Sequence, residues 1–171
     1  MVEKVRYSVI KKIDNIEIRE YPELILAFVE NMNDNKAFEL LFNYISGYNK
    51  TNEKIKMTAP VINSEKIEMT SPVISKENFM AFIMPSSYDE DSIPTPLDPN
   101  VKIKTESKRK LAVIKFGGYS TIKKIKKYES RLFQVLKSND IKIKGDPLLM
   151  RYNSPFAPSF IRRNEIGFEI D

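Results

Sequence analysis

The chain of 171 residues contains no cysteine and no histidine. Without cysteine there is no disulfide framework, no thiolate nucleophile and no Cys-based zinc or iron–sulfur site. Without histidine neither a Ser-His-Asp triad nor a Cys-His pair can form, and a transition-metal site would have to rely on carboxylates. We therefore expect a protein that is not an enzyme, with no catalytic residues and no metal site.

Long apolar runs are also missing. No stretch approaches the roughly 18 consecutive apolar residues that span a membrane, and the start of the chain lacks the apolar segment of a signal peptide. We therefore expect a soluble, cytoplasmic protein that does not interact with membranes. With 42% apolar residues the chain can fill one core, so we expect a single domain over residues 1–171.

Acidic residues are slightly outnumbered. The 28 lysines and arginines exceed the 23 aspartates and glutamates, which leaves a net charge of +5. Lysines gather at 102–110 and 123–127, but few aromatic residues stand between them for base stacking. A solvated basic surface therefore explains these lysines better than nucleic-acid binding does, although an interaction surface for protein or nucleic acid stays open as an alternative.

The first 30 residues have the pattern of two strands, at 5–13 and 16–30, joined by a turn at Asp14-Asn15. This pattern predicts a β-hairpin. The apolar run at 24–29 is continuous, which is typical of a strand that is covered on both faces and central in its sheet.

Two helices are expected, one in each part of the chain. The first should be capped by Asn33 or Asp34 and run to about Tyr48, and the second should run from about Ser120 to Leu136. The apolar positions of the first are Phe38, Leu41, Phe42, Ile45 and Tyr48. Those expected to face the core from the second are Ile122, Ile125, Leu132, Phe133 and Leu136.

The order of elements occurs twice. The first helix is followed by strand candidates at 54–71 and 79–84; the second is preceded by strands at 101–104 and 111–116 and followed by strands at 148–152 and 165–170. We therefore expect two related halves, about 1–91 and 100–171. The proline-rich segment 92–99 between them should cross the surface as an extended connector.

A short repeat is the most specific local feature. The sequence KIKMTAPV at 54–61 returns as KIEMTSPV at 66–73, a displacement of 12 residues. Ile55 and Met57, two residues apart, share one face of an extended segment, as do Ile67 and Met69, and the even displacement preserves this parity between the two copies. From the spacing alone, the repeat predicts two amphipathic strands that end at Pro60 and Pro72.

Several motifs follow one another in a fixed order. They are the duplicated MT-x-PV, FIMP at 82–85 with Tyr88, PTP at 94–96, FGGY at 116–119, and YN-x-P at 152–155 through RRNE at 162–165. Together they closely resemble the SOUL haem-binding protein family, from about Tyr7 to the C-terminus. The resemblance implies an α+β fold, a distorted antiparallel β-barrel of two pseudo-symmetric halves with two flanking α-helices.

The resemblance also implies a function, the non-catalytic and non-covalent binding of haem or another tetrapyrrole as carrier, buffer or sensor. The site would be a shallow apolar cleft between the first helix and the loop before the last strand. In this chain the helix corresponds to Phe38, Leu41, Phe42 and Ile45, and the loop at 155–163 contains Phe156 and Phe160, which can cover a porphyrin face. For the helix positions, ordinary core packing is the alternative.

A tetrapyrrole is a flat apolar disc with two propionates, so its cleft requires cations at the rim. The candidates are Arg162, Arg163, Lys50 and Lys54. For the two arginines the alternative is an ion pair with Glu165 or with a carboxylate of the hairpin. Whether the arginines contact propionates or form ion pairs within the protein, we expect the binding partner to be a planar apolar small molecule.

The chain departs from the family in two respects. Axial ligation of iron by His or Cys is excluded; Met57, Tyr44 and Tyr48 remain, with a core or rim role as their default. Gly167 stands where the family places an aromatic residue, and the missing ring would either widen the pocket or thin the core.

A second function stays open, that of a small-molecule effector-binding domain of the gyrase-inhibitor or drug-sensing type, because the duplicated architecture is similar. Such domains neutralise cationic ligands with a buried carboxylate. Glu39 and Glu68 are the candidates here, each with a solvent-exposed position as the alternative.

Overall fold

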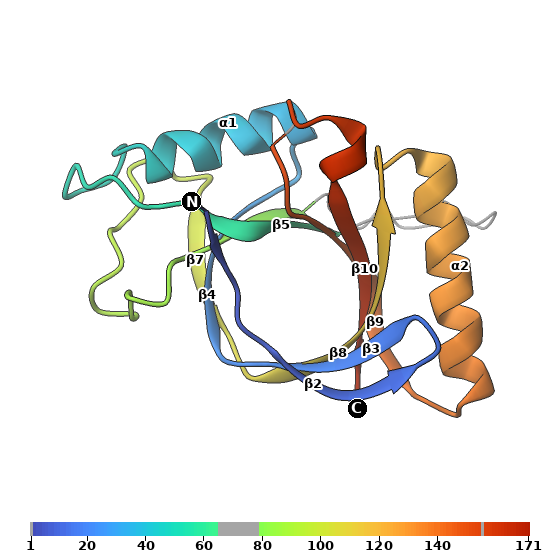
Figure 1. Ribbon diagram of the computed structural model, residues 1–171. Helices are drawn as coiled ribbons and strands as arrows, with labels where there is room; N and C mark the ends of the chain where they lie inside the picture. The colour runs from blue at the N-terminus through green and yellow to red at the C-terminus, as the bar shows by residue number, and fades with distance from the viewer. Residues whose placement is uncertain (1, 65–78, 155) are drawn as a thin grey trace.

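The computed structural model describes residues 2–64, 79–154 and 156–171, which form two helices and a ten-stranded sheet. The sheet curls into a barrel-like ring with both helices on its outside (Figure 1). The elements are β1 (Glu3–Lys4), β2 (Ser8–Ile13), β3 (Ile16–Tyr21), β4 (Leu24–Glu30), α1 (Asp34–Ile45), β5 (Thr58–Ser64), β6 (Phe79–Ile83), β7 (Lys102–Glu106), β8 (Arg109–Gly117), α2 (Ile122–Ser138), β9 (Ile143–Arg151), the short 3-10 helix η1 (Ser159–Ile161) and β10 (Arg163–Ile170).

The strand order is β2-β3-β8-β10-β9-β5-β6-β4-β7, with β1 paired to β5. All pairs along this order are antiparallel, and only the short β1 runs parallel to its neighbour. Because β2 and β7 do not pair with each other, the ring stays open. The predicted α+β fold is confirmed, with an open barrel-like sheet in place of a closed barrel.

The two halves have the same internal order. In the first, β6 lies between β4 and β5; in the second, β10 lies between β8 and β9. Each set of three strands is preceded in the chain by a strand that pairs with the other set. β3 precedes β4 and pairs with β8, and β7 precedes β8 and pairs with β4. The halves meet at the β5–β9 ladder, so the sheet is continuous across both.

The hairpin predicted at the start is present as β2 and β3, with the turn at Asp14-Asn15. The second strand, however, is not continuous from 16 to 30, because the chain breaks at Pro22-Glu23 into β3 and β4, which have different neighbours. β4 has partners on both sides, and its two faces are covered as predicted: Val29 packs beneath α1 and Leu26 faces the inside of the ring.

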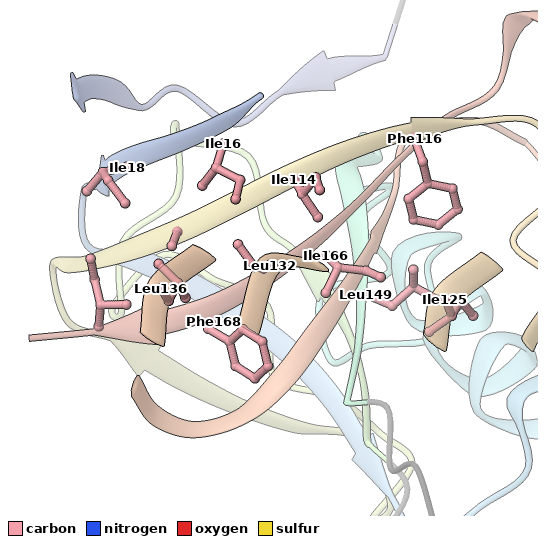
Figure 2. Packing of buried hydrophobic residues seen from close by; sticks show 12 residues of the cluster. Ile16, Ile18, Ile114, Phe116, Ile125, Leu132, Leu136, Leu149, Ile166 and Phe168 are labelled. Atoms are coloured by element: carbon pink, nitrogen blue, oxygen red, sulfur yellow. The ribbon is translucent and has the colours of Figure 1, made fainter. Parts of the chain in front are cut away.

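Alternate residues along the strands divide the core into three clusters. One face of β3, β8 and β10 packs against α2, and Figure 2 shows Ile125, Leu132 and Leu136 among the strand side chains there. One face of β4 and β6 packs against α1. The opposite faces of the same strands meet inside the ring, where Leu26, Ile83 and Val113 share a third cluster.

Both helices begin close to the predicted residues. The side chain of Asn33 accepts a hydrogen bond from the backbone N–H of Lys36 (2.9 Å), so Asn33, not Asp34, caps α1. α1 ends at Ile45, earlier than the predicted Tyr48, and Gly47 follows with φ +120°, a left-handed conformation that suits glycine. Thr121 caps α2 in the same way as Asn33 caps α1.

The core face of α2 was predicted too wide. Ile125, Leu132 and Leu136 are buried, but Ile122 and Phe133 are exposed. The buried residues of α2, together with Tyr128 and Val135, form the side of the helix that packs on the sheet. Ile122 lies in the first turn of α2, and Phe133 lies on a neighbouring side of the helix.

The prediction that the first copy of the repeat ends as a strand at Pro60 was wrong. β5 begins at Thr58, and its pairing with β6 shifts register between Thr58 and Val61. Such a bulge accommodates a proline, which has no N–H to donate, inside a strand; the Ala59-Pro60 bond is cis. The second copy, at 66–73, lies outside the described residues.

The segment 92–99 belongs to no strand of the sheet and lies against the end of α1, but turns and bends interrupt it, so it is not the extended connector that was predicted. The hydroxyl of Tyr44 donates to the carbonyl oxygen of Pro94 (2.7 Å), and the backbone N–H of Lys50 donates to that of Thr95 (2.9 Å).

Candidate functional site

An apolar cavity of about 430 Å³ lies between α1 and the chain that leaves β9. This volume is within the roughly 300–1,000 Å³ that is usual for small-molecule sites. Its walls come from five parts of the chain: Val2; Phe38 and Phe42 of α1; Met57, Ala59 and Val61; Met80 of β6; and Arg151, Tyr152, Asn153, Ser154 and Phe156.

The topology places this cavity between the two helices. α1 packs on β4 and β6, and α2 packs on β8 and β10, so the β5–β9 junction in the middle lies between their footprints. Figure 1 shows the helices on different parts of the ring, with β5 near α1. At this junction Val61 of β5 stands opposite Arg151 of β9, and both line the cavity.

Two stacked phenylalanines form the helix wall. The rings of Phe38 and Phe42 lie 6.0 Å apart between centroids and 14° from parallel. Phe38 also meets Phe82 of the core edge-on at 5.4 Å. Phe38 is therefore fixed from behind, while Phe42, half of whose surface is exposed, presents apolar area to the cavity.

A second hollow adjoins the first. It is lined by Phe42, Ile45, Ser46, Lys54, Ile55 and Met57, and it shares Phe42 and Met57 with the cavity. The two hollows thus lie on either side of one pair of apolar side chains. Together they give a shallow apolar surface along α1.

The residues predicted for the site divide into two groups. Phe38, Phe42 and Phe156 line the cavity, and Ile45 and Lys54 line the adjoining hollow. The cavity thus lies between the first helix and the chain before the last strand, the region in which the resemblance places a cleft. The residues predicted for the site that line neither hollow are Leu41, Lys50, Phe160, Arg162 and Arg163.

For three of these residues, their place in the fold explains why they line neither hollow. Leu41 is completely buried beneath α1, because it lies on the side of the helix that faces β4 and β6. Lys50 is exposed in the turn after α1. Phe160 lies on η1, largely exposed to solvent.

The two arginines bond elsewhere. Nη2 of Arg163 lies 2.7 Å from Oε1 of Glu165, which is the ion pair that the sequence left open as the alternative. Nε of Arg162 donates to the carbonyl oxygen of Ala157 (2.8 Å), and its guanidinium lies 4.5 Å from the ring centroid of Tyr119. Neither guanidinium lines the cavity as a rim cation.

Arg151, Ala59 and Val61 were missed as wall residues, and Met57 was considered only as an iron ligand or as a core or rim residue. The sequence did carry a signal for the last three, since they stand two residues apart in the first repeat. Arg151 had no such signal. Its position follows only from the pairing of β9 with β5 and β10.

A buried ionic network lies against the cavity. Arg19 of β3 and Glu165 of β10 are completely buried and form two parallel hydrogen bonds of 2.8 and 2.9 Å. Nη1 of Arg19 also donates to the hydroxyl of Tyr21 (2.9 Å), and the hydroxyl of Tyr152 donates to Oε2 of Glu165 (2.9 Å). The network therefore holds Tyr152, which lines the cavity.

The network keeps Glu165 ionised. Burial acts to raise the pKa of this carboxyl, but the hydrogen bonds and charges of Arg19 and Arg163 outweigh burial and hold the pKa below its usual value. Burial raises the pKa of Tyr21 to about 12 and raises that of Tyr152 as well. Glu165 is thus already neutralised by two arginines, and Tyr152 stays protonated.

The possible iron ligands are placed differently from one another. Met57 lines both hollows, whereas Tyr44 is buried with its hydroxyl bonded to Pro94 and Tyr48 is exposed outside the two hollows. Among the described residues, no group of three or more His, Cys, Asp or Glu side chains is placed to hold a metal ion.

Gly167 lies inside the ring and away from the cavity. A Cβ atom there would lie 3.0 Å from Cε of Met150 and 3.5 Å from Cγ2 of Val113. These two side chains fill the space next to the glycine. The missing aromatic ring therefore does not widen the cavity that the structure describes.

This combination defines a class of protein, an α+β ligand-binding domain with a barrel-like sheet, two outer helices and an apolar cavity beside the first helix. Residues 2–169 match the SOUL heme-binding protein family, and the chain belongs to that family. No curated protein sequence matches the chain. In the described part of the chain, neither helix is both long and apolar enough to cross a bilayer.

Solved structures share the fold at low sequence identity. The crystal structure of the EcmrR C-terminal domain has a TM-score of 0.65 and 12% identity, covering 96% of this chain and 98% of that one. An uncharacterized conserved protein from Listeria innocua has a TM-score of 0.67 and 10% identity, covering 92% of both chains. The crystal structure of a hydrolase from Listeria innocua has a TM-score of 0.65 and 10% identity, covering 95% of this chain and 94% of that one.

The cryo-EM structure of an EcmrR–DNA complex in EcmrR-RPo also has a TM-score of 0.65, with 10% identity over 91% of this chain. This chain covers 57% of that longer chain. At such identities, these neighbours support the fold alone.

Proposed function

We propose that this protein binds haem or a related tetrapyrrole non-covalently in the cavity beside α1, as a non-catalytic carrier, buffer or sensor in the cytoplasm. The observation that carries the proposal is the apolar cavity itself, found between the first helix and the loop before the last strand in a chain that belongs to a haem-binding family. Its ligand would be a planar apolar molecule.

The wall chemistry fits the flat face of a porphyrin. Phe42 and Met57 separate two adjoining hollows, so a disc can lie across both and contact apolar atoms over much of one face. Phe156, with 95% of its surface exposed, stands at the other rim and can cover part of the disc. Apolar burial of this kind contributes roughly 25 cal/mol per Å², and the entropy cost of association is set against this contribution.

The iron of a haem would contribute little to binding. His and Cys are absent from the chain, and the soft donors on the described walls are the thioethers of Met57 and Met80. A thioether is a weak ligand that more often fills apolar space. Iron, when bound, would supply redox and axial-ligand chemistry, but packing against the ring would determine affinity.

A non-catalytic role is supported by the polar groups of the wall. The hydroxyl of Tyr152 is bonded to Glu165, and burial raises its pKa, so it is not a ready base. Oδ1 of Asn153 accepts a hydrogen bond from the backbone N–H of Arg163 (2.7 Å). These groups hold the loop in shape, which suits binding better than proton transfer.

The charge of the wall favours this function over the sensing of lipophilic cations. Of the carboxylates considered for that role, Glu39 is exposed next to Lys36, and Glu68 lies outside the described residues. Glu165, which accepts a hydrogen bond from the wall residue Tyr152, is paired with Arg19 and Arg163. Arg151 gives the wall a positive charge, which would repel a cation.

The test is a visible-absorbance titration with haemin of the wild type, Phe42→Ala and the control Phe133→Ala. Phe42 and Phe133 are matched, since both stand on helices with 50% and 48% of their surface exposed, but only Phe42 lines the cavity. We expect Phe42→Ala to weaken binding by about 1 to 2 kcal/mol and Phe133→Ala to leave it unchanged. Equal affinity of all three proteins would refute the site, and no saturable binding to the wild type would refute the function.

A further inference from the structure

Arg151 is the charged residue among the described residues that line the cavity. It is the last residue of β9, opposite Val61 of β5 and Asn164 of β10. Both neighbouring strands fix its backbone, so its side chain leaves the sheet from a defined point. About 34% of that side chain is exposed.

The guanidinium of Arg151 is poorly paired for such a position. Nη1 lies 3.9 Å from Oδ2 of Asp34, which is beyond hydrogen-bond distance, and the carboxylate of Asp34 is mostly exposed. Nε is buried and has no hydrogen-bond partner among the described residues. A buried N–H of a cation without an acceptor is costly, and the cost is removed when an acceptor arrives.

Other arginines in this protein show what full pairing looks like. Arg19 holds Glu165 through two hydrogen bonds of 2.8 and 2.9 Å, and Arg163 holds the same carboxylate at 2.7 Å. Arg151 differs from both in that it faces the apolar cavity and its nearest carboxylate belongs to a hydrated residue. An acid brought by a ligand could approach closer than Asp34 does, in the two-pronged geometry that guanidinium favours.

We propose that Arg151 receives an acidic group of the ligand, so that the cavity selects planar apolar molecules that carry a carboxylate over their neutral analogues. This inference rests on the proposed function and names its ligand class. The apolar body would lie against Phe38 and Phe42, and the carboxylate would lie between Arg151 and the first turn of α1. The N-terminal end of that helix adds a favourable dipole for an anion.

The experiment compares protoporphyrin IX with its dimethyl ester, which keeps the ring and removes both charges. Binding is followed by porphyrin fluorescence in one detergent-containing buffer, for the wild type, Arg151→Met, Arg151→Lys and the control Arg131→Met on the exposed side of α2. We expect the wild type to bind the diacid about tenfold more tightly than the diester. Arg151→Met should lose most of this preference, with Lys54 of the adjoining hollow as the remaining cation; Arg151→Lys should fall between, and Arg131→Met should match the wild type.

A second variant tests the same idea without removing the arginine. Asp34→Asn removes the carboxylate that competes for Arg151, so it should tighten binding of the diacid a few-fold and leave the diester unchanged. An acid-to-ester preference that persists undiminished in Arg151→Met, or that is missing from the wild type while both porphyrins bind, would overturn the inference and leave the proposed function standing. If neither porphyrin bound to the wild type, the proposed function would fail, and the inference with it.

Discussion

Replacing Glu165 by Gln should destabilise the protein far more than any surface change. The substitution keeps the size of the side chain but removes the carboxylate that both terminal nitrogens of the completely buried guanidinium of Arg19 contact, and it leaves Glu17, 2.8 Å from Nε, as the remaining carboxylate partner of Arg19 among the described residues. Removing one member of a buried ion pair costs about 3 to 5 kcal/mol, because the remaining charge stays out of water. For a chain of this length that corresponds to a fall in Tm of about 6 to 20 °C.

The assay is thermal and urea unfolding followed by circular dichroism, with Glu169→Gln as the matched control. Glu169 stands on the same strand, but it is partly exposed and lies 3.5 Å from Arg109, so its loss should cost less than about 1 kcal/mol. A Glu165→Gln protein as stable as Glu169→Gln would refute our account of the network. A double variant, Arg19→Met with Glu165→Gln, should recover part of the loss, because no unpaired charge then remains at Arg19.

Three further predictions follow from individual contacts. Folding lowers the pKa of Glu165 from its ordinary value of 4.5, so the contribution of Glu165 to stability is present above about pH 4.5 and is lost as the pH falls below that value. Between pH 6 and pH 3, the urea midpoint should therefore fall more steeply for the wild type than for Glu165→Gln. Parallel curves for the two proteins would contradict this. Asn33→Ala should cost about 1 kcal/mol through loss of the α1 cap, whereas Asn43→Ala on the exposed side of the same helix should be neutral or stabilising; equal effects in urea unfolding would count against the cap. Gly167→Trp should lower stability by about 1 to 3 kcal/mol, because a Cβ atom there already lies 3.0 Å from Cε of Met150 and an indole would have to displace that side chain. A variant as stable as the wild type would show that the inside of the ring has room for an indole.

Much of the fold could be predicted from the sequence, because periodicity and turn chemistry act locally. Asp14-Asn15 is a turn, Asn33 is a cap, and the apolar run from Leu24 to Val29 is a strand with two covered faces. The break at Pro22 was missed because each side of it has strand character on its own. Only the partners, β8 for one segment and β6 for the other, divide them.

The site was harder to predict, since its walls come from segments that are far apart in the chain. Helical spacing cannot tell Leu41, which faces the sheet, from Phe42, which faces the cavity, until the position of the sheet is known. Arg163 looked like a rim cation, but strand pairing places it beside Glu165. Arg151 gave no local signal, because its exposure to the cavity depends on the β5–β9 register.

The measurement that tests the central claim most directly compares haemin with iron-free protoporphyrin IX on the wild-type protein. Apolar walls, the cations Arg151 and Lys54, and no histidine or cysteine mean that the ring and its carboxylates, not the iron, should determine affinity. We predict saturable binding of both with dissociation constants within about threefold of each other, a difference of under 1 kcal/mol. Haemin binding more than about tenfold tighter than the iron-free ring would show that iron ligation contributes, and would contradict the account.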